Sequence, residues 1–192
     1  PISTNASERL LFRQLYETLV RVDCDGHLRP GLAATWRLDL TGRTWLVTLD
    51  EQARFTDGTP VTTADVVSSW GEPGRDRVLG PEARGLVESV VPLSARVIGI
   101  TLRTTVSTSP RALADVVLAI ARREPGVSWP LGTTAFRVTA QRRRSSRQAG
   151  LVTIGLSAGS SAAVGVGPAH SVRFRVAPGM DIRDQLDAGV DL

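Results

Sequence analysis

Two short segments in which every second residue is apolar constrain the fold of this chain most, because such alternation is typical of half-buried β-strands. The alternating apolar residues are Trp36, Leu38 and Leu40 in the first segment and Trp45, Val47 and Leu49 in the second. Thr41-Gly42 lies between the segments, and a two-residue turn there would place Trp36 across from Val47. The same register would place Trp45 across from Leu38. The sequence therefore predicts a hairpin with one buried, aromatic face.

A helix is predicted before this hairpin. Leu11, Leu15 and Leu19 repeat every four residues, which is the spacing of one face of an amphipathic helix. Asn5 or Ser7 can cap its start. Because Val20 and Val22, which follow Leu19, are β-branched, the helix is expected to give way to a strand there.

A second helix is predicted after the hairpin. Asp57–Pro60 is a turn sequence, and Thr62 with Asp65 has the spacing of a capping box. Gly71 is expected to end this helix. The remaining predictions are strands at Ile98–Leu102, Phe136–Ala140, Leu151–Leu156 and Val172–Val176, helices beginning at Ser109 and Asp181, and loops over Gly71–Arg84 and Gly155–Gly167.

The charge balance argues against a nucleic-acid partner, although the isoelectric point is near 10.7. The 192 residues include 23 basic and 19 acidic ones, a net charge of +4, and every basic residue is an arginine. Because arginine titrates only above about pH 12, the isoelectric point overstates the basicity of the chain. The densest basic cluster, Arg142–Arg144 with Arg147, has no aromatic residue within it to stack on bases. We interpret it as a solvated hairpin tip rather than a phosphate or membrane contact.

The candidate reactive residues do not form a catalytic or metal-binding set. His27 and His170 are far apart in the sequence, outside the spacing of metal-ligand motifs. Cys24 lies between two aspartates, whose charge would raise the pKa of its thiol and make it a poorer nucleophile. Since no nucleophile, base and orienting acid occur together, we expect no catalytic residues, no metal ligands and no cofactor.

Several short motifs in a constant order carry a family resemblance. The motifs are Gln14–Val20, Asp25-Gly26, Leu28–Ala33, Trp36, Gly42–Trp45, Phe55–Thr62 and Ala64–Val67. Thinner matches follow in order at Pro130–Val138, Val172–Arg175 and Leu186–Leu192. Together they resemble the family 5 extracellular solute-binding proteins, the peptide and nickel receptors of ABC importers. The first set is the more specific, because many signals recur in order over a short span.

The sequence departs from this family pattern in three places. Thr134-Ala135 stands where the family has Gly-Pro, so the usual turn is in doubt there. The segment Leu156–Gly167 lacks the N-P-x-Y-W motif, which supplies an aromatic residue near the ligand. The stretch between Trp70 and Trp129 is short, which implies a reduced subdomain.

The resemblance implies an α/β fold: a lobe like that of type II periplasmic binding proteins, with a mixed β-sheet flanked by helices and a small β-rich subdomain. Residues 1–34 and 130–192 would form the main lobe, and residues 35–129 the smaller subdomain inserted in it. In the family, two lobes close on a ligand at a hinge. The matched part corresponds to the N-terminal lobe only, and we expect that no signal segment is present in this chain.

The resemblance also implies a function. The chain would be the ligand-binding lobe of an extracytoplasmic receptor, in the periplasm or lipid-anchored at the cell surface, with peptides or related small solutes as ligands. Its macromolecular partner would be the membrane permease of an ABC importer. The residues expected to line the ligand cleft are Tyr16, Glu17, Thr18, Trp129, Thr133, Thr134 and Phe136. For the three aromatic residues among them, packing in the core is the alternative role.

Other functions stay open at this stage. The same lobe could be the solute-sensing domain of a transcription regulator, which a helix-turn-helix in the parent gene would reveal. A degenerate lobe could also serve as an interaction surface, which would give a concentration-dependent dimer without ligand binding. An enzyme ranks last, because no catalytic constellation is present in the sequence.

Overall fold

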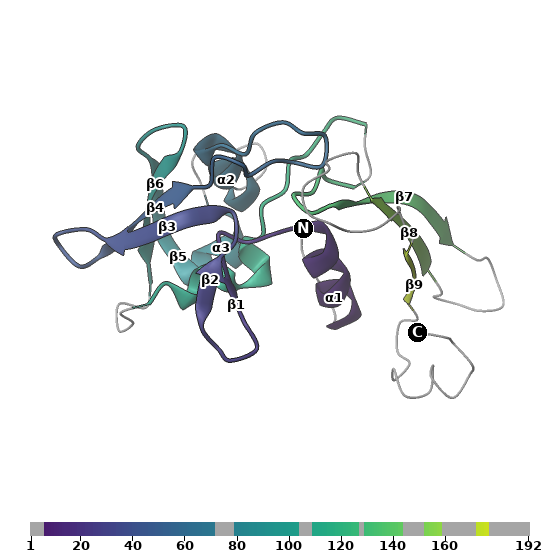
Figure 1. The fold of residues 1–192 in the computed structure, drawn as a ribbon, viewed down its shortest axis with the longest axis horizontal. Helices are drawn as coiled ribbons and strands as arrows, with labels where there is room; N and C mark the ends of the chain where they lie inside the picture. Colours follow the sequence, from purple (N-terminus) through teal and green to yellow (C-terminus); the bar gives the residue numbers. More distant parts are fainter. Residues whose placement is uncertain are drawn as a thin grey trace. The chain divides into compact units, whose positions relative to one another are not determined.

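The structure is a computed structural model that describes residues 6–71, 79–103, 109–126, 129–143, 152–158 and 172–176. The chain divides into two compact units: Pro1–Arg137 with Gly159–Gly165, and Val138–Ala158 with Val166–Leu192. Figure 1 shows the elements of both units. Among the described residues, no helix has the length and apolar character that a membrane span requires. The lobe boundaries implied by the resemblance, 1–34 with 130–192 and 35–129, stay a prediction.

The first unit begins with a helix and a small hairpin. Helix α1 spans Ala6–Leu15, and the two-stranded hairpin consists of β1 (Val20–Val22) and β2 (Leu28–Pro30). The predicted helix is therefore correct, but it ends one turn earlier than its leucine spacing indicates. Leu19 lies outside the helix and is completely buried. Ser7 lies inside the helix, and Asn5 is outside the described residues.

A four-stranded antiparallel sheet forms the centre of the first unit, in the order β3-β4-β6-β5. Its strands are β3 (Ala33–Leu38), β4 (Thr44–Leu49), β5 (Val87–Pro92) and β6 (Val97–Leu102). The predicted hairpin register is confirmed, because Trp36 pairs with Val47 and Leu38 pairs with Trp45. Strand β6 is also confirmed, whereas β5 at the sheet edge was not predicted.

The turn of this hairpin differs from the prediction. The Asp39 amide donates to the Thr44 carbonyl at 2.9 Å, so the connection is longer than two residues. The Asp39 carboxylate also accepts hydrogen bonds from the Arg43 and Thr44 amides, both at 3.2 Å. Since these bonds close a wider loop, Leu40 leaves the strand alternation and is fully exposed. Gly42 lies in this loop with φ +68°, a conformation that favours glycine.

Two short α-helices pack beside β5 (Figure 1). Helix α2 spans Thr63–Trp70, and its capping box is confirmed: the Asp65 carboxylate accepts from the Thr62 amide at 2.8 Å. Gly71 is its C-cap, as predicted. Helix α3 spans Pro81–Leu86, with proline at its first turn. It occupies a stretch whose sequence predicted only a loop.

The prediction of a continuous helix from Ser109 is wrong, because this stretch forms 3-10 turns. Two 3-10 turns, η1 (Arg111–Ala114) and η2 (Val116–Leu118), stand in its place. Asp115 separates them with an extended backbone, and its side chain accepts from the Val117 amide. This side-chain bond competes with continuous helix. The turns still carry core residues, because Leu113 and Leu118 are fully buried and the Trp70 indole donates to the Leu118 carbonyl at 2.8 Å.

The second unit is described through strands of a three-stranded sheet, in the order β7-β8-β9. Strand β7 spans Phe136–Arg143 and begins in the first unit; β8 spans Val152–Ala158 and β9 spans Val172–Val176. All three strands were predicted. Strand β8 extends into the segment expected to be a loop from Gly155, and it pairs antiparallel with β9. The Arg144–Arg147 part of the basic cluster, the rest of the glycine-rich segment and the helix predicted at Asp181 lie outside the described residues.

Candidate functional site

The candidate site is built where the segment after α1 meets a segment more than a hundred residues later. The Glu17 amide donates to the Thr133 hydroxyl at 2.8 Å, and the Thr134 hydroxyl donates to the Gln14 carbonyl at 2.5 Å. The Thr133 amide donates to the Leu15 carbonyl at 3.2 Å. Because these bonds satisfy main-chain groups that the end of a helix leaves free, they hold the two segments together.

Two glycines let main chain approach main chain at this junction. A Cβ atom at Gly132 would lie 2.1 Å from the Leu15 carbonyl oxygen. A Cβ atom at Gly31 would lie 2.4 Å from the Thr18 carbonyl oxygen. No other residue fits at either position without moving the backbone. We call the contacts of residues 15–18 with Gly31 and residues 132–134 the glycine junction.

Thr56 extends the glycine junction toward the Asp57–Pro60 turn. Its amide and its hydroxyl both donate to the Gly132 carbonyl at 2.8 Å. The Asp57 carboxylate accepts from the Thr59 amide at 2.9 Å, and Gly58 has φ +86°, so the predicted turn is confirmed. The turn therefore positions a buried threonine against the second segment of the site.

Two hollows open on the described surface at the glycine junction, and they share Glu17, Gly31 and Thr134. The first hollow has a volume of about 360 Å³ and is lined in part by Arg13, Tyr16, Glu17, Thr18, Arg21 and Thr134. The second hollow has a volume of about 400 Å³ and is lined in part by Glu17, Asp50, Arg54, Phe55, Thr133 and Thr134. Both volumes are in the range that small-molecule sites occupy.

Glu17 is held firmly while its carboxylate stays available. Its amide is bound to Thr133, and its carbonyl accepts from the Ile120 amide at 2.8 Å. The side chain is half-buried, and its carboxylate makes no hydrogen bond or ion pair with another described residue. Burial raises the pKa of this carboxyl above its usual value, and the nearby Arg21 partly opposes the rise.

Tyr16 lines the first hollow, although its side chain is almost entirely buried. Its hydroxyl donates to the Pro130 carbonyl at 3.3 Å, and its ring packs edge-on against Phe12, with centroids 5.7 Å apart. Burial raises the pKa of the Tyr16 phenol to about 12. Trp129 also packs edge-on with Phe12, with centroids 6.5 Å apart.

The structure brings together five of the seven residues predicted to line a cleft: Tyr16, Glu17, Thr18, Thr133 and Thr134. Trp129 and Phe136 line neither hollow, and the aromatic packing of Trp129 supports its alternative role in the core. Sequence reasoning missed Arg13 and Arg21, which lie four residues on either side of Glu17. It also missed Asp50 and Arg54, for which no sequence pattern exists, because only the fold carries them to the second hollow.

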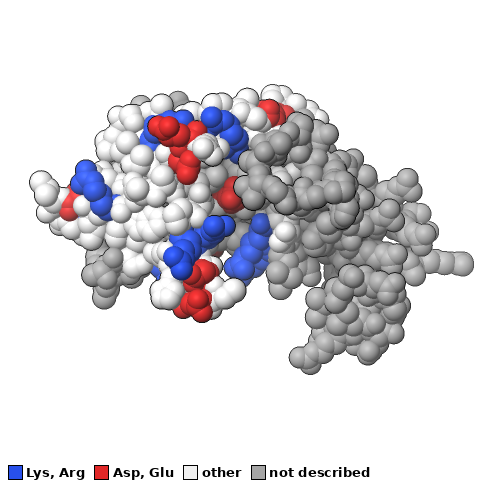
Figure 2. All heavy atoms as spheres, in the orientation of Figure 1, with Lys and Arg blue, Asp and Glu red and all other residues white. Residues whose placement is uncertain are grey.

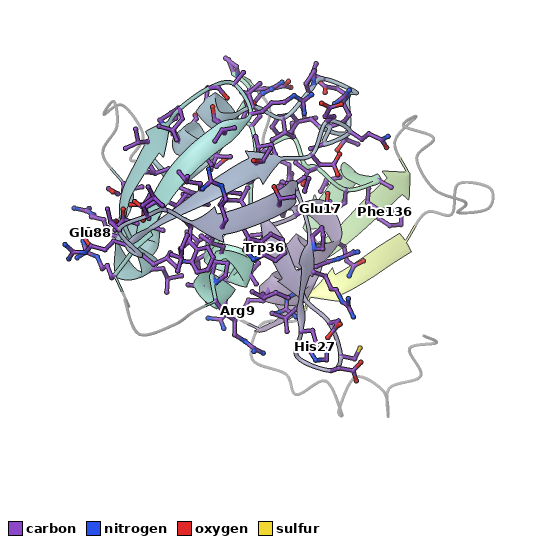
Figure 3. The ribbon with its side chains drawn as sticks, turned by 60° about the vertical axis from the view of Figure 1, so that its left-hand side comes forward. Arg9, Glu17, His27, Trp36, Glu88 and Phe136 are labelled. Atoms are coloured by element: carbon purple, nitrogen blue, oxygen red, sulfur yellow. The ribbon has the colours of Figure 1, made fainter. Side chains whose placement is uncertain are left out.

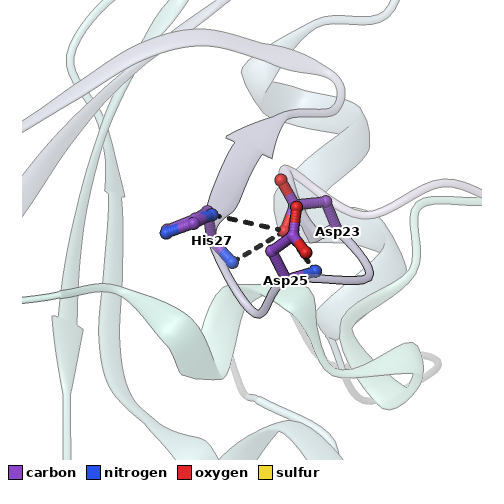
Figure 4. Close-up of side chains that lie close together, drawn as sticks. All are labelled: Asp23, Asp25 and His27. Carbon is purple, nitrogen blue, oxygen red and sulfur yellow. Dashed lines mark hydrogen bonds and ion pairs between the residues drawn. The ribbon is translucent and has the colours of Figure 1, made fainter.

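An acidic cluster at the β1–β2 turn lies apart from the hollows. Asp23, Asp25 and His27 offer ligand atoms within 4.8 Å of one another (Figure 4). Asp23 oxygens, however, already accept from the His27 amide and the Arg29 guanidinium, both at 2.8 Å. The Arg29 side chain and then the His27 amide lower the pKa of Asp23.

These hydrogen bonds stabilise the β1–β2 turn, which agrees with the prediction of turn residues there. Figure 3 shows His27 at the tip of this hairpin, at the end away from Glu17. Cys24, in the same turn, is exposed.

A family model for bacterial extracellular solute-binding proteins, family 5 Middle, matches residues 27–148, more than half of the chain. The chain belongs to this family. Similar relatives include the periplasmic murein peptide-binding protein MppA of Escherichia coli, 38% identical over 73 residues, and the periplasmic oligopeptide-binding protein OppA of Escherichia coli, 41% identical over 63 residues. These alignments cover 38% and 33% of this chain but only 13% and 11% of the relatives.

Solved structures share the fold. The Escherichia coli murein tripeptide-binding protein MppA superposes with a TM-score of 0.62 at 22% identity, over 81% of this chain and 34% of that one. HbpA2 from Haemophilus parasuis superposes with a TM-score of 0.71 at 17% identity, over 97% of this chain and 42% of that one. The predicted α/β class and the type II periplasmic-binding-protein fold are confirmed. The chain spans less than half of the length of these proteins.

Proposed function

We propose that this chain is the ligand-binding lobe of an extracytoplasmic solute-binding protein that serves an ABC importer, with peptides or related small solutes as ligands. Family membership makes binding, rather than catalysis, the starting point. The names of the relatives, which bind oligopeptides and murein peptides, support the peptide part of the proposal. The proposed partner is a membrane permease. The proposed location is the periplasm or the cell surface.

The observation that carries the proposal is the convergence of distant polar groups on the two hollows. Glu17 and Thr18 come from one end of the first unit's sequence and Thr133 and Thr134 from the other, yet hydrogen bonds hold both pairs at one surface. Concave sites with a few rigidly placed polar groups are typical of small-molecule binding. Tyr16, Glu17, Thr18, Thr133 and Thr134 are the proposed wall of the site; for Trp129 and Phe136, packing behind it is favoured.

The first test is direct binding of peptides to the 192-residue chain. Isothermal titration with mixed di- to pentapeptides is expected to give saturable heat. Amide chemical-shift changes in the isotope-labelled chain are expected to map to residues 16–18 and 133–134. Peptide concentrations in the millimolar range are appropriate, because a lobe that contacts one side of a ligand binds it weakly.

A filling variant tests the location. Ala135 lines the second hollow, so Ala135→Trp is expected to occupy that hollow and to reduce binding about tenfold or more. Ala34→Trp is the matched control, because Ala34 is exposed on β3 and lines neither hollow. Absence of heat and of shift changes with every peptide would contradict the peptide proposal. Equal binding by both variants would contradict the location.

A further inference from the structure

The charged side chains divide differently between the two hollows. The first hollow has Arg13 and Arg21 against Glu17. The second hollow has Glu17 and Asp50 against Arg54. Figure 2 shows that acidic and basic side chains are interspersed on the visible face, so the sign of the potential changes over short distances. A ligand at this surface therefore meets a basic first hollow and an acidic second hollow, with Glu17 between them.

Arg54 is the one arginine among the described residues that line the second hollow, and its guanidinium is already hydrogen-bonded. Arg54 Nη1 donates to the Glu51 carbonyl at 2.7 Å and to the Ala53 carbonyl at 3.0 Å, both in its own loop. The Asp50 carboxylate accepts from the Gln52 amide at 2.7 Å, which fixes its position at the edge of the hollow. No hydrogen bond or ion pair joins Arg54 to Glu17 or Asp50 among the described residues. The two carboxylates therefore keep acceptor capacity toward the hollow.

We infer that the second hollow binds a positively charged group of the ligand, an ammonium or a guanidinium, between Glu17 and Asp50. This inference rests on the proposed function and names the chemistry that the site selects. Glu17 is the stronger determinant, because its main chain is held on both sides by Thr133 and Ile120, while its half-buried carboxylate makes no hydrogen bond or ion pair with another described residue. Hydrogen bonds to a partly buried charge are stronger than those on an open surface. Arg13 and Arg21 would repel the same group from the first hollow.

The raised pKa of Glu17 agrees with this assignment. Burial disfavours the ionised carboxylate and Arg21 only partly opposes this, so a cation bound beside Glu17 would favour the ionised form further. A cationic ligand would therefore gain a favourable interaction with the ionised Glu17 carboxylate, which a neutral or anionic ligand would not.

The experiment uses three blocked tripeptides that differ only in one side-chain charge: N-acetylated, C-amidated Ala-Lys-Ala, Ala-Gln-Ala and Ala-Glu-Ala. Blocking removes the terminal charges, so any preference reports the central side chain. The chain is expected to bind the lysine peptide about tenfold more tightly than the glutamine peptide and the glutamate peptide most weakly. The measurement is titration of amide chemical shifts, which gives both the dissociation constant and the location.

Three variants decide between selection by Glu17 and general electrostatic attraction. Glu17→Gln keeps the shape of the side chain, and it is expected to reduce the ratio of lysine to glutamine affinity to between one and three. Glu51→Gln removes the same charge from the exposed residue next to Asp50, which lines neither hollow. It is expected to leave the ratio of lysine to glutamine affinity unchanged. Asp50→Asn is expected to reduce the ratio by a smaller factor than Glu17→Gln does.

The outcomes separate the two proposals. If all three peptides bind equally, or if Glu17→Gln leaves the ratio unchanged, the inference is overturned while the proposed function stands. If the lysine peptide is preferred but its shifts map to Arg13 and Arg21, the assignment to the second hollow is overturned. If no blocked peptide binds, the inference is overturned, and the proposed function fails with it only if the unblocked di- to pentapeptides also do not bind.

Discussion

Two junctions organise the first unit, and they use different chemistry. The glycine junction brings main chain against main chain, with no side chain between Gly132 and the Leu15 carbonyl. The second junction, which we call the arginine junction, is made by one long side chain. Arg122 donates to the Asp65 carboxylate at 3.0 Å and to the Thr59 hydroxyl at 2.8 Å, and its guanidinium lies 4.0 Å from the centre of the Phe55 ring.

The difference between the junctions lies in what each can tolerate. A side chain can change rotamer to relieve a poor contact, whereas a backbone contact can relax only by moving a whole segment. The glycine junction is also the one that shapes the hollows, because Glu17, Gly31 and Thr134 belong to it and line both hollows. We therefore expect substitutions at the glycine junction to cost more stability and to affect binding directly.

The largest expected effect comes from Gly132→Ala. The added methyl group would lie against the Leu15 carbonyl oxygen, so the two segments must separate, at a cost of about 3 kcal/mol or more in the free energy of unfolding. Chemical denaturation monitored by tryptophan fluorescence measures it. Gly85→Ala in α3 is the control, because a Cβ there meets nothing within 4 Å and alanine favours helix. A Gly132→Ala chain as stable as the parent would show that the close approach does not exist.

The next effect is a loss of stability at alkaline pH through Tyr16, the single tyrosine of the chain. Its pKa is raised to about 12, above the ordinary value of 10, because the folded state buries the phenol. The Tyr16 phenol is therefore neutral in both the folded and the unfolded state below pH 10. The free energy of unfolding falls as the pH rises from 10 through 12, by about 2 to 3 kcal/mol.

Two measurements check the Tyr16 prediction. Tyrosinate absorbance of the folded chain is expected to develop near pH 12, and that of the denatured chain near pH 10. Tyr16→Phe is the control, since it is expected to remove this part of the pH dependence. A phenol that titrates normally in the folded chain would contradict its burial at the glycine junction.

A comparable or smaller effect is expected at the arginine junction. Arg122→Met keeps the apolar stem but removes the ion pair, the hydrogen bond to Thr59 and the stacking on Phe55, at a cost of about 2 kcal/mol. Arg122→Lys is expected to lie between this variant and the parent, because an ammonium cannot reproduce the planar contacts. Thermal unfolding measures both. Arg123→Met, at an exposed neighbouring position, is the control and is expected to be nearly neutral. A smaller loss for Gly132→Ala than for Arg122→Met would reverse the order of the two junctions.

The smallest expected effect is a gain in stability from Glu17→Gln. The pKa of Glu17 is raised in the folded state. The carboxyl group therefore contributes fully to the free energy of unfolding below the ordinary carboxyl pKa, and this contribution is lost as the pH rises through the pKa of the folded state. At neutral pH the ionised group therefore opposes folding. The Glu17→Gln substitution is expected to increase the free energy of unfolding by less than about 1 kcal/mol at pH 7 and to leave it unchanged at low pH. Thermal unfolding across this pH range tests the sign, and a destabilised variant at pH 7 would contradict it.

Much of the local structure could be predicted from the sequence. The hairpin register of Trp36 with Val47, the Thr62–Asp65 capping box and the Asp57–Pro60 turn all depend on residues close together in the chain. The errors also have local causes. The Asp39 carboxylate widened one turn, and Asp115 broke one helix into two 3-10 turns. Both are side-chain hydrogen bonds to backbone that hydrophobic spacing does not reveal.

The sequence by itself determined the family, the strand and helix order at its front, and five of the residues that line the hollows. Only the tertiary structure decided that Asp50 and Arg54 join them. It also decided that the Glu17 carboxylate has no hydrogen-bond or ion-pair partner among the described residues, while the Asp23 carboxylate has three hydrogen-bond partners. The physical reason is distance along the chain. Periodicity and capping act over a few residues, whereas the contact of Glu17 with Thr133 spans 116 residues and forms only when the sheet and both glycines bring the segments together.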